Sequence, residues 1–242
     1  MKPLAVLAAA LAPCLAGADQ LPQGLLRMSE VAPWIATDIR YAREFNFTGG
    51  VVPGYEAAEC IVTEATAAAL IAAEESLNAD GYGLILFDCY RPQRAVDHFL
   101  AWAGSGKAGV VDEVFLPGID RNRLIGGGYI AARSSHRFGA TVDVGLRRIG
   151  DPMLYPQHVP GQRCDGPVAE RPMDSSLNLG TSFDCFSPLS ALDAAVPEPA
   201  RRNRERLRQA MQDAGFASYA AEWWHFRHAT DPAQVALDIA VD

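Results

Sequence analysis

The chain has few histidines, few cysteines, no excess of basic charge and no second long apolar run. There are five histidines and five cysteines in 242 residues, and no internal repeat or low-complexity tract is present. Beyond the first 18 residues, no apolar stretch is long enough to span a bilayer. The formal net charge is −8, which disfavours nucleic-acid binding. The 49% hydrophobic content instead suffices for one domain with a substantial core.

The first 18 residues have the pattern of a secretory signal peptide. Lys2 supplies a positive start, an Ala/Leu-rich stretch too short to span a bilayer follows, and Ala16-Gly17-Ala18 has the A-x-A form of a cleavage site. Cys14 offers a lipoprotein alternative, which Pro13 disfavours because a small residue usually precedes the lipidated cysteine. We therefore expect residues 1–18 to be removed, and residues 19–242 to be periplasmic or secreted.

Cysteine usage is consistent with export. Cys14 leaves with the signal peptide, so four cysteines remain, and an even number in an oxidising compartment suggests disulfides. Of the three possible full pairings we favour Cys60–Cys89 and Cys164–Cys185. Four buried free thiols are the alternative, because free cysteine is a common core residue.

Two separated motifs carry the residue types of a hydrolytic zinc site. His136 and Asp143 lie seven residues apart, and Glu222 lies three residues before His225. Two imidazoles and one carboxylate can hold zinc and leave the fourth position open for water, while a second carboxylate serves as general base. Either motif alone is weak evidence, and a Trp-rich strand is more often core. Both together, on a chain with five histidines, favour a metal site.

The spacing in each motif requires irregular backbone. The segment after His136 is rich in extended-chain residues, and residues seven apart in a regular strand face opposite sides. We therefore expect His136 in a loop, a turn at Gly139, and a strand that carries Asp143 inward. Glu222 and His225 would also face opposite sides of a regular strand, so their use at one metal needs an irregularity or a strand end.

At these residues the chain resembles the VanX-type D-alanyl-D-alanine dipeptidases, which are zinc peptidases of the hedgehog/DD-peptidase fold. The family's Ser-x-His-x-x-Gly-x-x-x-Asp segment matches Ser134 to Asp143, and its Glu-x-x-His matches Glu222 to His225. The resemblance runs from about Ile39 to His225. Further matches, in order along the chain, are Asn46-Phe47-Thr48-Gly49, Gly54-Tyr55-Glu56, Gly81-Tyr82-Gly83-Leu84, Tyr90-Arg91-Pro92 and Phe183-Asp184.

The resemblance implies roles for individual residues. The implied ligands of one zinc ion per chain are His136, Asp143 and His225, and the implied base is Glu222. Arg91 is implied to stabilise the oxyanion, and the implied substrate-positioning residues are Tyr41, Ser134 and Asp184. Without the resemblance, Arg91 is better explained as a salt-bridge partner of Asp88 or as a solvated turn residue. The chain departs from the family at Thr141, where alanine is common, and at residues 147–182, which form a longer segment with many prolines and glycines.

The periodicity of the chain predicts an α+β fold, a single domain with a central antiparallel sheet flanked by helices. The expected helices are 62–79, with Thr63 as its cap, 92–102, opened by Pro92, and 197–214. The expected strands are 82–88, 140–146, 222–227 and 235–241, and residues 107–122 are expected to be a loop.

The resemblance implies zinc-dependent hydrolysis of D-alanyl-D-alanine to two D-alanines in cell-wall peptide metabolism, with a small D,D-dipeptide as substrate. A D,D-carboxypeptidase acting on peptidoglycan stem peptides is the alternative among enzymes, and it needs an open groove. A zinc-stabilised module that binds cell-wall peptides without cleaving them is the alternative outside enzymes. Glu222 and Arg91 argue against the module, because a structural zinc site is usually closed by a fourth protein ligand.

Overall fold

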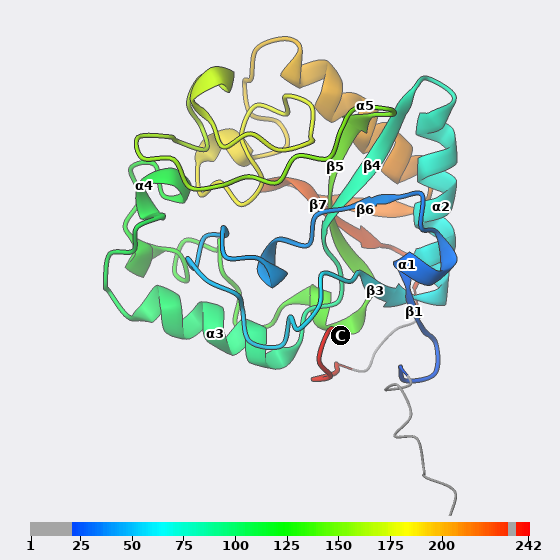
Figure 1. Cartoon of the computed structure of the whole chain (residues 1–242), viewed down its shortest axis with the longest axis horizontal. Helices are drawn as coiled ribbons and strands as arrows, with labels where there is room; N and C mark the ends of the chain where they lie inside the picture. The colour runs from blue at the N-terminus through cyan, green and yellow to red at the C-terminus, as the bar shows by residue number, and fades with distance from the viewer. Residues whose placement is uncertain (1–20, 232–235) are drawn as a thin grey trace, which may run out of the picture.

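A five-stranded sheet, ordered β2–β4–β5–β7–β6, forms the centre of the molecule (Figure 1). The computed structural model describes residues 21–231 and 236–242, so the expected signal segment lies outside the described residues. A second, two-stranded sheet pairs β1 with β3. The strands are β1 (Leu25–Arg27), β2 (Ala36–Thr37), β3 (Ile61–Thr63), β4 (Tyr82–Asp88), β5 (Thr141–Arg148), β6 (Phe216–Tyr219) and β7 (Glu222–His228).

The two longest helices, α2 and α5, pack against each other and against the sheet, and α3 lies apart from them (Figure 1). The helices are α1 (Met28–Val31), α2 (Glu64–Asn78), α3 (Gln93–Gly104), α4 (Asp112–Phe115) and α5 (Ala200–Asp213). The expected α+β class is confirmed. The sheet is antiparallel except at one edge, where β2 runs parallel to β4.

The helix boundaries differ slightly from the sequence expectation, for local reasons. α2 begins at Glu64 because residues 61–63 form β3, paired with β1. Thr63 is its cap, as predicted, since the Thr63 hydroxyl accepts a hydrogen bond from the Thr66 amide at 3.1 Å. Pro92 lies at the N-cap of α3 rather than at its first helical position. Residues 107–122 are mostly irregular, as expected, but they contain the short helix α4.

The strand expected at 235–241 is wrong. Residue 235 lies outside the described part of the chain, residues 236–240 form no strand, and Val241 makes one isolated parallel bridge to Tyr55. The backbone groups of this segment bond to loops instead of a sheet edge. The Val241 amide donates to the Gly54 carbonyl, and the Ile239 amide donates to the Tyr90 hydroxyl. The apolar pattern of this segment therefore reflects its packing against the core and not a place in a sheet.

Both cysteine pairs favoured by the sequence are disulfides in the structure, Cys60–Cys89 and Cys164–Cys185. The second one anchors the long segment 147–182, whose regular elements among the described residues are the last two residues of β5 and a 3₁₀ turn at Val168–Glu170. The buried Arg40 also holds this segment, through an ion pair with Asp174.

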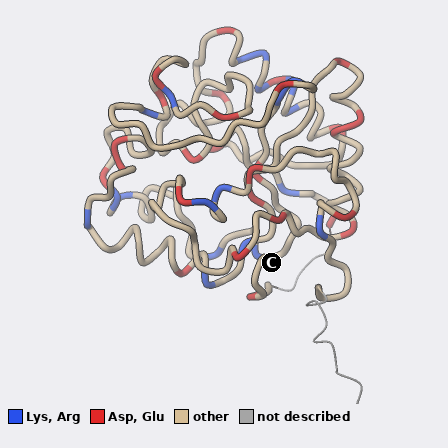
Figure 2. The backbone as a smooth tube through the Cα atoms, viewed as in Figure 1, with Lys and Arg blue, Asp and Glu red and all other residues tan. Residues whose placement is uncertain are grey.

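Acidic and basic positions are interspersed along the chain trace rather than gathered into one basic stripe (Figure 2). The helices in the described ranges include none with the length and apolarity needed to cross a membrane.

Candidate metal centre and active site

Three neighbouring strands bring three ionisable side chains into one row across the sheet. Asp143 on β5 pairs in register with Asp88 on β4 and with His225 on β7. A bulge in β4, between Leu86 and Asp88, sets this alignment with Asp143. Because successive residues of a strand alternate between faces, Asp143 points away from the buried Val142 and Val144. One face of the sheet therefore carries a compact acidic and imidazole cluster.

His136 reaches this row from the turn that precedes β5. Ser135–Phe138 form a 3₁₀ turn, and Gly139 ends it in the left-handed conformation at φ 70°. The turn expected at Gly139 is thus confirmed, and glycine suits it because other side chains are strained at positive φ. The turn folds the chain back, so that His136 and Asp143 face each other despite their odd spacing.

The irregularity expected between Glu222 and His225 is also present. β6 pairs Ser218 with Phe226 and then Tyr219 with Glu222, so residues 223–225 of β7 have no partner on β6 at this point. This bulge rotates Glu222 relative to the regular strand. Its carboxylate Oε2 lies 3.7 Å from His225 Nδ1, on the same side as the rest of the cluster.

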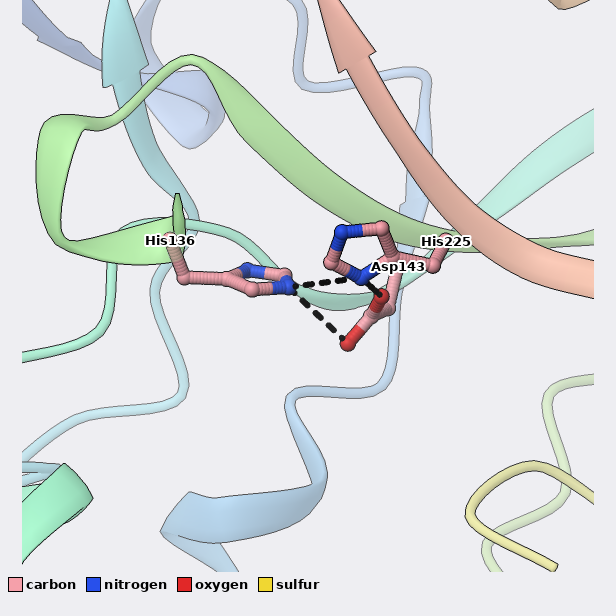
Figure 3. Close-up of side chains that lie close together, drawn as sticks. All are labelled: His136, Asp143 and His225. Carbon is pink, nitrogen blue, oxygen red and sulfur yellow. Dashed lines mark hydrogen bonds and ion pairs between the residues drawn. The ribbon is translucent and has the colours of Figure 1, made fainter. Parts of the chain in front are cut away.

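His136, Asp143 and His225 present three donor atoms to one point (Figure 3). His136 Nε2 lies 3.2 Å from His225 Nδ1 and 3.4 Å from Asp143 Oδ2, and His225 Nδ1 lies 3.1 Å from Asp143 Oδ1. Two ligands that are each about 2.1 Å from a tetrahedral zinc ion lie about 3.4 Å apart. The three separations are close to this value, with a different carboxylate oxygen of Asp143 nearest each imidazole. Two imidazoles and one carboxylate are a donor set of known catalytic zinc sites.

The surroundings of both imidazoles favour this use. His136 Nδ1 lies 2.8 Å from the Cys89 carbonyl, which can only accept, so Nδ1 carries the proton and Nε2 presents its lone pair to the cluster. On His225, Nε2 lies 3.4 Å from the Ser135 hydroxyl and Nδ1 faces the cluster. A hydrogen bond to the second ring nitrogen is the usual way in which a metal-binding histidine is oriented.

Electrostatics keep Asp143 ionised. Burial by itself would raise the pKa of Asp143, but the charges and hydrogen bonds of His136 and His225 outweigh it and hold that pKa well below its usual value. For His225, burial lowers the pKa, whereas the hydrogen bond and the charge of Asp143 raise it, and the net result is a raised pKa. Metal binding would displace the proton that this pairing favours on His225.

Glu222 lies beside the three donors and is not one of them. Its side chain is 17% exposed. Burial raises the pKa of Glu222 to about 7, against the opposing charge of His225. A bound dication would lower this pKa again, since it favours the ionised carboxylate. Glu222 is thus placed where it can exchange a proton with a molecule in the cavity.

Arg91 makes the salt bridge that the simpler interpretation expected, and it also faces the cluster. Its Nε donates to Asp88 Oδ2 at 2.9 Å, and its Nη2 lies 2.8 Å from the same oxygen. Nη2 lies 3.6 Å from Asp143 Oδ2 as well. The guanidinium lies over the rings of Tyr41 and Phe99. This setting holds the planar group in the wall of the cavity beside the donors, with 13% of the side chain exposed.

The residues expected to position substrate line the same cavity of about 420 Å³, together with Arg91 and Glu222. The Tyr41 hydroxyl donates to Asp184 Oδ2 at 3.0 Å, and both side chains are buried. Burial and the charge of Asp143 raise the pKa of Asp184 well above its usual value. Ser134 lines the cavity and also caps the 3₁₀ turn, by accepting from the His136 amide at 3.3 Å. The described residues of segment 147–182 are not among those that line the cavity.

The sequence interpretation missed the supporting role of Asp88 and Tyr55. Asp88 is fully buried, accepts a 2.6 Å hydrogen bond from the Tyr55 hydroxyl, and lies 3.4 Å from His136 Nδ1. One carboxylate thus contacts both Arg91 and a candidate ligand. A clue was present, because an ionisable residue that ends an otherwise apolar strand needs a partner in the core.

The chain belongs to the D-Ala-D-Ala dipeptidase family of M15 peptidases. The family model described as D-ala-D-ala dipeptidase matches residues 22–155 and 150–240, which together cover most of the chain. The resemblance seen in the motifs is thereby confirmed. The family assignment makes the chain a metallopeptidase, as expected.

Curated relatives agree with this assignment. The D-alanyl-D-alanine dipeptidase of Streptomyces coelicolor is 38% identical over 206 residues, which cover 85% of this chain and 91% of that protein. The D-alanyl-D-alanine dipeptidase of Enterococcus faecium is 36% identical over 203 residues, which cover 84% and 90%. Among solved structures, a zinc-bound mutant of the vancomycin-resistance D,D-pentapeptidase VanY is matched weakly, with a TM-score of 0.37 and 12% identity over 70% of this chain and 74% of that one. The family assignment does not depend on this last match.

Proposed function

We propose that the chain hydrolyses the dipeptide D-alanyl-D-alanine to two D-alanine molecules, using one zinc ion held by His136, Asp143 and His225. The observation that carries the proposal is the convergence of these three donors, all within 4.8 Å of one another, next to a fourth ionisable group, Glu222. A structural zinc site is normally closed by a fourth protein ligand, whereas here the neighbouring carboxylate stands apart from the donors. The names of the curated relatives support the choice of substrate.

When bound, zinc lowers the pKa of a coordinated water to roughly 7 and polarises the peptide carbonyl. Glu222 accepts the proton of the attacking water on its carboxylate and then delivers it to the leaving amine of the second alanine. General acid–base catalysis of this kind typically contributes about 10²–10⁴-fold to the rate.

Arg91 stabilises the oxyanion that develops on the peptide carbonyl. Its guanidinium is always charged, and Asp88 together with two aromatic rings holds it in place before substrate arrives. A pre-positioned oxyanion donor contributes about 3–4 kcal/mol in other hydrolases. Ser134, Tyr41 and Asp184 position the substrate. The Asp184 carboxyl, held by Tyr41, lines the cavity, and the positive amino group of a short peptide would lower its raised pKa and pair with it.

Export from the cytoplasm is part of the proposal. The A-x-A pattern ending at Ala18 and the two disulfides both suit a periplasmic or secreted chain. The enzyme would then act on peptides released from the cell wall and not on the cytoplasmic pool of precursors.

A comparison of two substrates tests this function. The zinc-loaded protein is incubated with D-alanyl-D-alanine or with a stem pentapeptide that ends in D-alanyl-D-alanine, and released D-alanine is measured. We expect release from the dipeptide and little from the pentapeptide. Release from the pentapeptide instead would establish a D,D-carboxypeptidase, and binding of either peptide without release would establish a binding module.

A further inference from the structure

The Cys60–Cys89 disulfide lies beside the metal centre, because the carbonyl of Cys89 contacts His136. Both cysteines are fully buried, and their Cα atoms are 5.3 Å apart. Cys60 immediately precedes β3 and Cys89 immediately follows β4. The Tyr90 amide donates to the Ile61 carbonyl at 2.9 Å, so the two segments also lie side by side through their backbones.

The carbonyl of Cys89 is the group that orients His136. It accepts the Nδ1–H of His136 at 2.8 Å, which directs Nε2 toward the other two donors. The contact is reciprocal, because the Arg91 amide donates to the His136 carbonyl at 3.2 Å. Cys89 lies just beyond the last β4–β5 pair, Asp88 with Asp143. The position of its carbonyl therefore depends on contacts other than the ladder of the main sheet.

The β3 strand also contacts the turn that carries His136, at the end that follows His136. The Thr63 amide donates to the Gly139 carbonyl at 3.0 Å, so β3 contacts the chain after His136 as well as the segment before Arg91. A Cβ atom added to Gly139 would lie in van der Waals contact with Thr63, 3.5 Å from its amide nitrogen, so Gly139 packs against β3 as well. Cys60, at the start of β3, links this bracing strand covalently to the residue that orients His136.

We infer that the Cys60–Cys89 disulfide is a positioning element for the metal ligand His136, and that tight zinc binding requires it. The inference rests on the proposed metal site. Without the bond, the Cys89 carbonyl is held less firmly, and the His136 ring samples more orientations. Zinc binding then has to order the ring, and this entropy cost weakens the affinity. Loss of the partners that orient metal-binding histidines typically lowers metal affinity about 10–100-fold.

The second disulfide provides a matched control. Cys164–Cys185 closes a loop of similar length, with a sequence separation of 21 against 29, and has a similar Cα separation of 5.4 Å. Both of its cysteines are also buried. The Cys164 amide donates to the Val114 carbonyl in α4 at 2.9 Å, and the Cys164 carbonyl accepts from the Ser182 amide at 2.8 Å, so this bond is tied to α4 and to the end of its own loop. Removal of either bond changes the unfolded chain similarly, but only one of the two bonds adjoins a zinc ligand.

The experiment compares zinc affinity in three full-length proteins. These are the parent, the Cys60→Ser/Cys89→Ser variant and the Cys164→Ser/Cys185→Ser variant. Each metal-free protein competes for zinc with a chromophoric chelator, at a temperature where circular dichroism shows all three folded. We expect the Cys60/Cys89 variant to bind zinc at least about tenfold more weakly than the parent, and the Cys164/Cys185 variant to match the parent.

Equal zinc affinity in all three proteins, or an equal loss in both variants, would overturn the inference. A parent that binds no zinc would instead refute the proposed function itself. If the Cys60/Cys89 variant does not fold, the same question is answered by reducing the single remaining disulfide of the folded Cys164/Cys185 variant with a phosphine, which is then removed anaerobically. Zinc affinity should fall on reduction, and an unchanged affinity in the reduced, folded protein would refute the positioning role.

Discussion

Glu222 stands next to the proposed zinc donors without being one of them, which makes its role separable from theirs. Glu222→Gln keeps the size and polarity of the side chain but removes its ability to accept a proton. We expect zinc to stay bound and kcat for D-alanyl-D-alanine to fall by about 10²–10⁴-fold or more, since one group serves two proton transfers. Metal analysis and steady-state kinetics on the same preparation measure both effects. If the variant retained zinc and more than about a tenth of the parent kcat, Glu222 would not be the base.

A substitution at His136 tests the metal-binding part of the site. His136→Ala removes one of three donors and leaves a buried cavity beside Asp143, so we expect both zinc content and activity to be lost. Metal analysis of the purified variant, with the Glu222→Gln protein as a control that keeps its metal, measures this. Stoichiometric zinc together with full turnover would refute the assignment.

The sequence identified the residues at the centre of the site, but not those that support them. His136, Asp143, Glu222 and His225 were identified because their residue types and spacing form motifs. Asp88 was considered only as a salt-bridge partner of Arg91. Its alignment with Asp143 depends on a bulge between Leu86 and Asp88, and no residue type in that apolar stretch marks the bulge in the sequence.

At the scale of elements, the predictions that rest on local sequence patterns were correct, and the one that depends on strand pairing was not. The strand at Tyr82–Asp88 and the cap at Thr63 were predicted correctly, because hydrophobic pattern and capping chemistry are local. The expected strand at 235–241 was wrong, because an apolar run shows burial and not the partner of its backbone groups. The bulge in β7 was anticipated only because two candidate residues had to reach one point. Function thus supplied a constraint that local periodicity could not.

The contact between α2 and β4 contains a buried carboxyl whose charge opposes folding. Glu74 is buried, and its Oε2 accepts a hydrogen bond from the Leu84 amide at 2.6 Å. Burial raises the pKa of Glu74, with the Leu84 hydrogen bond acting against it. A carboxyl whose folded pKa lies above its unfolded pKa binds protons more tightly in the folded state, so its contribution to stability falls as pH rises through that window.

Glu74→Gln removes this ionisation while keeping a hydrogen-bond acceptor. We therefore expect the melting temperature of the variant, relative to the parent, to improve between pH 4 and pH 7. Thermal unfolding at the two pH values measures this difference, and comparing the change with pH cancels any constant cost of the substitution. The same relative melting temperature at both pH values would contradict the assignment.

The disulfides act at this scale too. Peptide mapping of non-reduced, exported protein by mass spectrometry should find Cys60 joined to Cys89 and Cys164 joined to Cys185. In a chain-entropy estimate, each loop of this length contributes about 3–4 kcal/mol to the free energy of unfolding. Four alkylatable thiols in the exported protein would refute the pairing.

At the scale of the whole molecule, the prediction concerns the first residue of the mature protein. If residues 1–18 are a signal peptide, protein recovered from outside the cytoplasm should start at Asp19, as read by N-terminal sequencing. A chain that starts at Met1, in a cytoplasmic fraction, would refute export. A lipidated Cys14 in the membrane fraction would establish the lipoprotein alternative instead.

The Cys60–Cys89 bond has a consequence for when the enzyme can work. If the chain is exported as proposed, cytosolic reductants would keep Cys60 and Cys89 as free thiols before export. A dithiol reductant would have the same effect on the folded enzyme, because it reduces the Cys60–Cys89 bond to two thiols and is itself oxidised to a disulfide. Such a chain would bind zinc at least about tenfold more weakly than the disulfide-bonded enzyme. If the chain is exported as proposed, full zinc loading and full hydrolysis of D-alanyl-D-alanine would thus follow formation of this bond outside the cytoplasm.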